Sequence, residues 1–147
     1  MADFLSGMRV SASGMAAQRL RMNTISSNIA NINTTRTPEG GAYRRKDVVF
    51  EAMPDAKSFG EIVMSSDPRH DVQRVQVVDV VSDTKAPIMK YEPNHPDANE
   101  EGYVAYPNIN HMEEMANMIM ATRLYEANIS ALQASKDMAA SALELGR

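Results

Sequence analysis

The chain has 147 residues, enough for one domain of ordinary size, with no Cys, no Trp and a formal net charge of −4. The absence of Cys excludes disulfides, Cys-ligated zinc and thiol nucleophiles, and the negative charge disfavours a generic nucleic-acid-binding protein. No apolar run approaches the roughly 20 residues that a transmembrane segment needs, and the first thirty residues lack the features of a cleaved secretory signal. Twelve Met against three Phe and five Tyr indicate an adaptable aliphatic core.

Charge is distributed unevenly along the chain. Residues 1–46 carry seven Lys or Arg and two Asp or Glu, a net charge of +5, whereas residues 47–111 carry five against twelve, a net charge of −7. A basic start and an acidic middle can steer neighbouring copies or partners into a preferred orientation. A solvated surface with accidental clustering is the alternative interpretation.

The N-terminal third predicts a long helix over about residues 5–33. Apolar residues recur at seven-residue spacing, with a partly apolar row three residues later, which is typical of a coiled-coil-like seam. The two rows are Met1, Met8, Met15, Met22 and Ile29, and Phe4, Ser11, Gln18, Ile25 and Ile32. Because residues 23–35 are rich in the weak helix formers Asn, Ser, Thr and Ile, packing must hold them helical, and fraying into a loop is the alternative.

The middle of the chain predicts short strands. Pro38 and the Gly40–Gly41 pair end the first helix, because proline restricts the residue before it and glycine permits positive φ. Strands are expected at residues 43–50 and 72–81, with a shorter one at 61–64. Five of the seven prolines lie between residues 50 and 100, so we expect a small β-hairpin or sheet with long connections.

The C-terminal third predicts a second helix of about 35 residues. Asn110 or His111 can cap it, and Glu113 and Glu114 in its first turn suit the helix dipole, whereas the paired Glu100 and Glu101 are expected in a solvated loop. Three rows at heptad spacing, mostly apolar, make a face wider than a two-stranded seam requires. The rows are Met115, Thr122, Ile129, Lys136 and Leu143, then Met118, Tyr125, Leu132 and Ala139, then Leu124, Ala131, Met138 and Leu145.

Side chains suited to catalysis or metal binding are scarce. His95 and Asp97 could form part of a metal site or an acid–base pair, but a metal needs about three converging ligands, and His70 and His111 stand apart. No nucleophile elbow, P-loop or dinucleotide fingerprint is present. We therefore expect no enzyme activity, no cofactor and no metal. The basic triplet 44–46 could bind phosphate or an acidic patch on a neighbouring chain.

These patterns predict a mainly α fold with a small β part. Long N- and C-terminal helices (1–36 and 111–147) are expected to pair as a coiled-coil-like hairpin, joined by a β-hairpin and a Pro-rich extended middle (37–110). A middle of this size cannot wrap two such helices, and each large apolar side chain left exposed forgoes roughly 1.5–3 kcal/mol. The sequence therefore predicts an assembly subunit. A helical adaptor or chaperone of a secretion machine is the alternative, although such a bundle would not need the β middle.

Four stretches resemble bacterial flagellar rod and hook proteins. Residues 26–34, Ser-Ser-Asn-Ile-Ala-Asn-Ile-Asn-Thr, resemble the Asn-rich N-terminal signature of that family. Residues 35–50, 94–109 and 113–128 are similar to a proximal rod protein of the family. Residues 51–86 match poorly.

The resemblance implies a subunit of the flagellar basal-body rod, the drive shaft that crosses the periplasm. It implies terminal helices that self-assemble, transmit torque and line the export channel. Export would use the flagellar type III apparatus without a cleaved signal peptide. The implied partners are further copies of the chain, other rod proteins and the rod-base adaptor protein.

The resemblance also implies roles for individual residues. Asn28, Asn31, Asn33, Pro38 and Gly41 would shape the junction between the first helix and the first strand. The expected assembly contacts are Met8, Met15, Met22, Asn28, Ile29, Asn31, Asn33, Arg44, Arg45, Asn108, Met115, Met118, Tyr125, Asn128 and Leu132. The alternative is that the Asn residues merely form turns and that Met115 and Tyr125 belong to an intrachain core.

Overall fold

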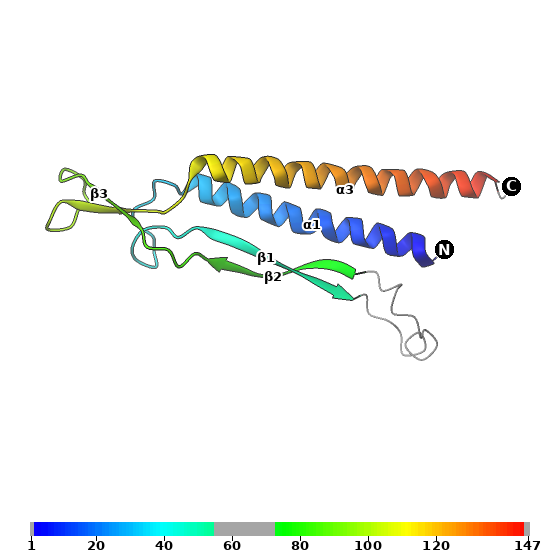
Figure 1. Cartoon of the computed structure of the whole chain (residues 1–147), viewed down its shortest axis with the longest axis horizontal. Helices are drawn as coiled ribbons and strands as arrows, with labels where there is room; N and C mark the ends of the chain where they lie inside the picture. Colours follow the sequence, from blue (N-terminus) through cyan, green and yellow to red (C-terminus); the bar gives the residue numbers. More distant parts are fainter. Residues whose placement is uncertain (1, 55–72, 146–147) are drawn as a thin grey trace. The chain divides into compact units, whose positions relative to one another are not determined.

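The structure is a computed structural model that describes residues 2–54 and 73–145. Its elements in chain order are α1 (Ala2–Ala30), β1 (Lys46–Pro54), β2 (Gln73–Ser82), β3 (Ile88–Tyr91), β4 (Tyr103–Tyr106) and α3 (His111–Leu145) (Figure 1). The predicted fold class, mainly α with a small β part, is confirmed. The strand predicted at 61–64 lies outside the described residues. Among the described helices, none combines the length and apolar character that crossing a membrane requires.

The chain divides into two compact units that interleave along the sequence. The terminal unit draws on residues 1–19, 50–78 and 122–147, and the junction unit on residues 20–49 and 79–121. Each of the three segments predicted from the sequence contributes to both units. The predicted division of the chain into segments 1–36, 37–110 and 111–147 therefore stays a prediction.

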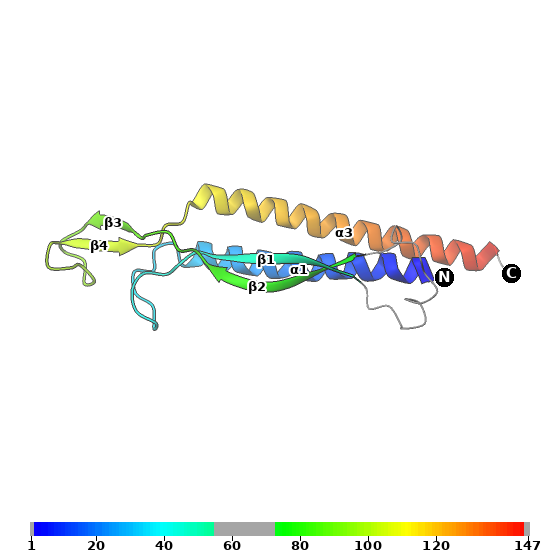
Figure 2. The same ribbon diagram turned by 60° about the horizontal axis from the view of Figure 1, so that its bottom comes forward.

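The strands form two separate two-stranded sheets. β1 pairs with β2, and the two strands run in opposite directions (Figure 1). β3 and β4 form an antiparallel ribbon in which Ile88 faces Tyr106 and Tyr91 faces Tyr103 (Figure 2). The sequence analysis missed this ribbon, although its second strand, Tyr103-Val104-Ala105-Tyr106, has strand-forming residues directly after a glycine with φ +81.

The first helix ends at Ala30, three residues before its predicted end. The Asn31 side-chain amide donates to the Ser27 carbonyl oxygen at 2.9 Å, and the Thr34 hydroxyl donates to Asn31 Oδ1 at 3.1 Å. Such local side-chain bonds compete with helix continuation. The first strand begins at Lys46 rather than residue 43, because the Tyr43 N–H donates to the Thr34 carbonyl at 3.1 Å and is not part of the sheet.

The second helix begins and ends close to its prediction. Asn110 is its cap, because Asn110 Oδ1 accepts from the Met112 N–H at 3.1 Å and the Asn110 carbonyl accepts from the Glu114 N–H at 3.0 Å. His111, the other candidate cap, is the first helical residue. The helix covers 35 residues, as expected.

Buried apolar side chains are few and concentrated in the junction unit. Ile25, Val48, Val104, Ile109 and Ala121 are buried there, whereas Ala17 is the one buried apolar residue among the described residues of the terminal unit. The terminal unit therefore has little core of its own.

The most buried residues of α1 lie off the predicted Met row, although one of them, Ile25, belongs to the predicted row three residues later. Ala17, Thr24, Ile25 and Asn28 are buried, while Met8, Met15, Met22 and Ile29 are half-buried. A small residue explains the shift in the terminal unit, because the Asn128 side chain lies 3.0 Å from where a Cβ on Gly14 would sit. The helices approach closely at this glycine, which moves the contact away from the Met row.

Candidate functional site

A buried polar network joins three elements of the junction unit, and Asn28 lies at its centre. The Asn28 amide donates to the Lys46 carbonyl at 2.8 Å and to Glu114 Oε2 at 3.0 Å. Asn28 Oδ1 accepts from the Lys46 N–H at 2.9 Å and from the Tyr43 hydroxyl at 3.1 Å. The side chain, with no exposed surface, thus uses both donors and both acceptor positions. It ties α1 to the first residue of β1 and to the first turn of α3.

Glu114 is the anionic member of the network and is 1% exposed. Its Oε1 accepts from Arg45 Nε at 2.8 Å, and Arg45 also pairs with Asp47 at 3.1 Å. A buried carboxylate is tolerable because it is paired and hydrogen-bonded. Burial by itself would lower the pKa of Arg45, but its hydrogen bonds to Glu114 and Asp47 raise that pKa above its ordinary value, so the guanidinium stays charged.

The pair separates neighbouring residues by their surroundings. Glu114 is buried whereas Glu113 is exposed, because successive helical residues point about 100° apart. Arg45, expected among the assembly contacts, is half-buried and binds Glu114 and Asp47 of its own chain, and its contact role stays a prediction. Arg44 and Lys46 on either side of it are exposed.

The loop between α1 and β1 carries the predicted turn. The Thr37 N–H donates to the Gly41 carbonyl at 2.9 Å, and the Gly40 N–H donates to the Thr37 carbonyl at 3.0 Å. Gly40 and Gly41 have φ of 93° and 78°, values at which residues with a side chain are strained. Pro38 lies exposed within this turn.

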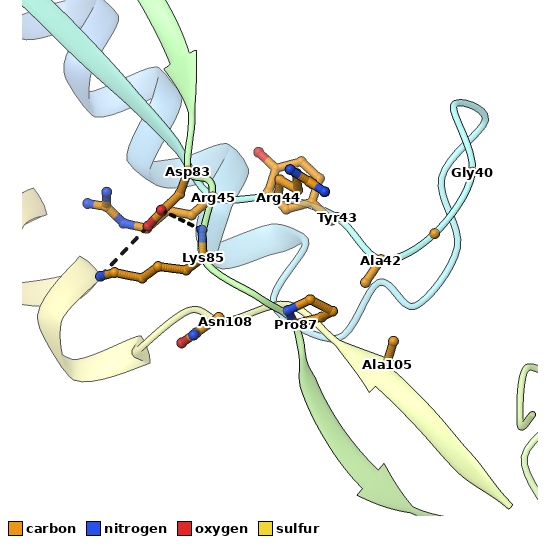
Figure 3. Close-up of a pocket in the computed structure, with 11 residues that line it drawn as sticks. Gly40, Ala42, Tyr43, Arg44, Arg45, Asp83, Lys85, Pro87, Ala105 and Asn108 are labelled. Carbon is orange, nitrogen blue, oxygen red and sulfur yellow. Dashed lines mark hydrogen bonds and ion pairs between the residues drawn. The ribbon is translucent and has the colours of Figure 1, made fainter. Parts of the chain in front are cut away.

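A hollow of about 190 Å³ lies beside this loop (Figure 3). Residues 40–45, which lead into β1, form one wall, and the segment that leads into β3 forms another. Two exposed cationic side chains, Arg44 and Lys85, line the hollow. Asp83 Oδ2 lies 3.8 Å from Lys85 Nζ. Asn108 also lines the hollow, and its amide donates to the Ala86 carbonyl at 3.2 Å.

Large apolar side chains are exposed along α3. Met115, predicted as a contact, is 45% exposed, and the others range from 45% to 72%. The set consists of Met112, Met115, Ile119, Met120, Leu124, Met138 and Leu143. Within the described residues nothing covers them, which leaves them open to another chain.

The remaining predicted contact residues occupy several environments. Met118, Tyr125, Asn128 and Leu132 are half-buried, as is Asn31, whereas Asn33 and Asn108 are exposed. Met15 and Tyr125 come together in the terminal unit, where they line one shallow hollow.

Asn28, expected as an assembly contact, has no exposed side-chain surface, and its bonds lie at the helix–strand junction of its own chain. Its contact role stays a prediction.

His95 and Asp97, which were considered for metal binding or acid–base chemistry, stabilise a turn. His95 Nδ1 accepts from the Asp97 N–H at 3.1 Å, and Asp97 Oδ2 accepts from the Thr35 hydroxyl at 2.7 Å. His70 lies outside the described residues. Across residues 2–54 and 73–145, no three His, Cys, Asp or Glu side chains gather as metal ligands would.

Two long helices tied by a buried network, with a scarce core and an uncovered apolar helix surface, define a helical assembly protein. A family model described as "Flagella basal body rod protein" matches residues 8–36, and one described as "Flagellar basal body rod FlgEFG protein C-terminal" matches residues 100–145. The first match contains Asn28, and the second contains Glu114.

Curated relatives span nearly the whole chain. The flagellar basal-body rod protein FlgC of Borreliella burgdorferi is 40% identical over 145 residues, which cover 95% of each chain. FlgC of Bacillus subtilis is 40% identical over 95% of this chain and 96% of the relative, and FlgC of Escherichia coli O6:H1 is 35% identical over 94% of each. The chain belongs to the FlgC family of flagellar basal-body rod proteins.

Proposed function

We propose that this chain is a structural subunit of the proximal rod of the flagellar basal body. The observation that carries the proposal is the number of large apolar side chains exposed along α3, because exposed apolar surface of this extent marks an interface. The relatives named as rod proteins support a structural rather than a catalytic role. In the rod, the terminal helices would help transmit torque and line the export channel.

The proposed partners are further copies of the chain, other rod proteins and the rod-base adaptor protein. The exposed members of the predicted contact set, such as Asn33, Arg44 and Met115, are available for these contacts. The half-buried members would contribute by packing at the edge of an interface. We further propose that the chain reaches the periplasm through the flagellar type III apparatus without a cleaved signal.

Substitutions on α3 test the proposal. Ile119→Lys and Leu124→Lys place a charge on side chains that are 54% and 45% exposed, so the isolated subunit should fold. In an assembled rod the same charge would be buried without a partner, which costs several kcal/mol in every copy. Both variants should therefore abolish motility when they replace the wild-type chain, while export of the polypeptide continues.

Gln133→Lys is the matched control, because it adds the same charge at an exposed polar position of the same helix. Circular dichroism of the purified variants checks folding, and isolation of basal bodies checks incorporation. Normal motility with either Ile119→Lys or Leu124→Lys would contradict an assembly role for this surface. Absence of the wild-type chain from purified basal bodies would refute the proposed function itself.

A further inference from the structure

We propose that the hollow beside the 37–42 loop receives the Glu100–Glu101 turn of a second copy of this chain. The inference rests on the proposed function, because it requires copies that assemble. It specifies one contact that the helices do not supply. The occupant is a pair of carboxylates on a rigid turn, and the receptor is a hollow bordered by cations.

The hollow that acts as receptor is lined by two cationic side chains that have no ion pair, or only a long one, within the described part of the chain. Arg44 is exposed and forms no ion pair among the described residues, in contrast to Arg45 beside it. The Lys85 side chain is 72% exposed, and its pair with Asp83 is long at 3.8 Å. Arg44 therefore lines this hollow without an ion-pair partner among the described residues (Figure 3).

A second hollow, also lined by residues 42–44, extends the positive surface. It shares Arg44 with the first hollow and adds Arg36 and Lys46. The two hollows together are bordered by more unpaired cations than acids, since Glu39 and Asp83 are the acids beside them. A concave positive surface concentrates acidic groups and orients an approaching chain.

The ligand is a turn that the chain holds rigid. Asn99 Oδ1 accepts from the Glu101 N–H at 3.1 Å and from the Tyr103 N–H at 2.7 Å. The Gly102 N–H donates to the Asn99 carbonyl at 2.9 Å. Glu100 and Glu101 are exposed, and neither forms an ion pair among the described residues. A turn already ordered in the free chain loses little conformational entropy when it binds.

Gly102 reinforces this rigidity. Its φ is +81°, and a Cβ at this position would lie 2.9 Å from the Tyr91 ring. The edge of Tyr91 in turn packs against Tyr103, with ring centroids 5.4 Å apart. The carboxylates thus project from a packed aromatic end of the β3–β4 ribbon.

The β3–β4 ribbon separates the turn from the hollow of the same chain. The hollow touches Pro87 and Ala105, at the end of the ribbon where Ile88 faces Tyr106. The turn lies beyond Tyr103 at the opposite end, and a strand rise of about 3.4 Å per residue places Tyr103 roughly 7 Å along the ribbon from Ala105. This separation favours a turn from another copy.

The hollow and the Glu100–Glu101 turn are different surface patches of one chain, so the contact between two copies is heterologous. A heterologous contact builds a ring when its rotation closes and an open filament when it does not. Either product contains more than two copies. This property separates the proposed contact from a two-fold dimer interface, which stops at two.

Disulfide trapping tests the contact, because the chain has no Cys of its own. Ala42→Cys places a thiol in the wall that the two hollows share, and Glu100→Cys places one on the turn while Glu101 remains. Cells carrying the doubly substituted chain are grown with a reductant, and their basal bodies are isolated and oxidised. We expect a ladder of disulfide-linked species that extends beyond the dimer.

Ala42→Cys with Glu113→Cys is the matched control, because Glu113 is an equally exposed glutamate of the junction unit that lies outside the turn. It should yield at least tenfold less linked product. Chains that carry only one of the two contact thiols should yield no ladder. Equal yields from the control pair, or a link to a protein of a different mass, would overturn the proposal.

Charge exchange provides an independent readout in chains without Cys. Arg44→Glu and Glu101→Lys should each reduce motility at least tenfold, and their combination should restore most of it, as expected for directly coupled residues. Failure of the combination to recover motility, with both single variants impaired, would overturn the pairing. If the wild-type chain is found in basal bodies but the doubly substituted chain yields no ladder, the proposed function stands and this contact alone is refuted.

Discussion

The buried Glu114 is paired with the half-buried Arg45, although the two lie 69 residues apart in the chain. Neither would be stable in the interior alone, since burying an unpaired charge costs far more than a pairing returns. Asn28 completes the arrangement by occupying the second carboxylate oxygen. Three polar side chains thereby set how the end of α1, the start of β1 and the start of α3 meet in the junction unit.

Removing the carboxylate should destabilise the fold selectively. Glu114→Ala leaves the Arg45 guanidinium and one Asn28 donor without their partner, and we expect the free energy of unfolding to fall by about 3 kcal/mol. Urea unfolding of the purified chain, followed by circular dichroism, measures this loss. Glu113→Ala removes an exposed carboxylate one residue earlier and should change stability by less than about 0.5 kcal/mol. Equal losses from the two substitutions would show that the network carries no special stability.

Two glycines of α1 differ at the scale of the helix. Gly7 has no atom within 4 Å of where its Cβ would lie, whereas a Cβ on Gly14 would meet the Asn128 side chain at 3.0 Å. Glycine weakens a helix interior, so its presence at Gly14 needs a packing reason. The close approach to Asn128 of α3 is that reason.

Alanine substitution should separate the two glycines. Gly7→Ala should raise the free energy of unfolding by about 0.5–1 kcal/mol, the ordinary difference between Gly and Ala in a helix. Gly14→Ala should not raise the free energy of unfolding in this way, because the new methyl group displaces the Asn128 side chain. Adding Asn128→Ala to Gly14→Ala should recover the gain. Thermal unfolding compares the four proteins, and an equal gain at both glycines would contradict the close approach.

The turn at Gly40 and Gly41 should tolerate some side chains better than others. Both glycines have open space around them, so a substitution is strained only through the backbone at positive φ. Gly40→Val combined with Gly41→Val should cost about 2–4 kcal/mol, since left-handed geometry costs roughly 1–2 kcal/mol per residue. Asn at both positions should cost less, because Asn adopts this geometry more readily. Urea unfolding provides the comparison, and equal costs for Val and Asn would refute the backbone explanation.

The two units differ in how much they bury. The junction unit buries Ile25, Val48, Val104, Pro107, Ile109 and Ala121 together with the polar Thr24, Asn28 and Glu114, against Ala17 in the described part of the terminal unit. Local opening is easiest where few apolar contacts resist it. The isolated chain should therefore be least stable in its terminal unit, and neighbouring chains would supply the missing burial.

Hydrogen exchange should reveal this difference within a single helix. In the isolated chain, amides of residues 6–19 of α1 should exchange at least tenfold faster than those of residues 20–30, which corresponds to about 1.4 kcal/mol in opening free energy. Residues 20–30 contain the buried Thr24, Ile25 and Asn28. Incorporation into a rod should slow exchange in residues 6–19 most. Uniform protection along α1 of the isolated chain would contradict a weak terminal unit.

The sequence by itself determined the features that depend on nearby residues. Helical periodicity placed α3, Asn110 marked its cap, and Pro38 with the glycine pair marked the turn, because each signal acts within about one helical turn of the chain. The four-residue strands β3 and β4 were not predicted, because so short a run of residues carries almost no hydrophobic periodicity.

Tertiary structure alone decided that Glu114 rather than Glu113 is buried, that Arg45 faces inward, and that Asn28 is central to the fold. Their burial depends on how two helices and a strand meet, which brings together side chains up to 86 residues apart. Only the assembled contact supplies the partners that make a buried charge stable.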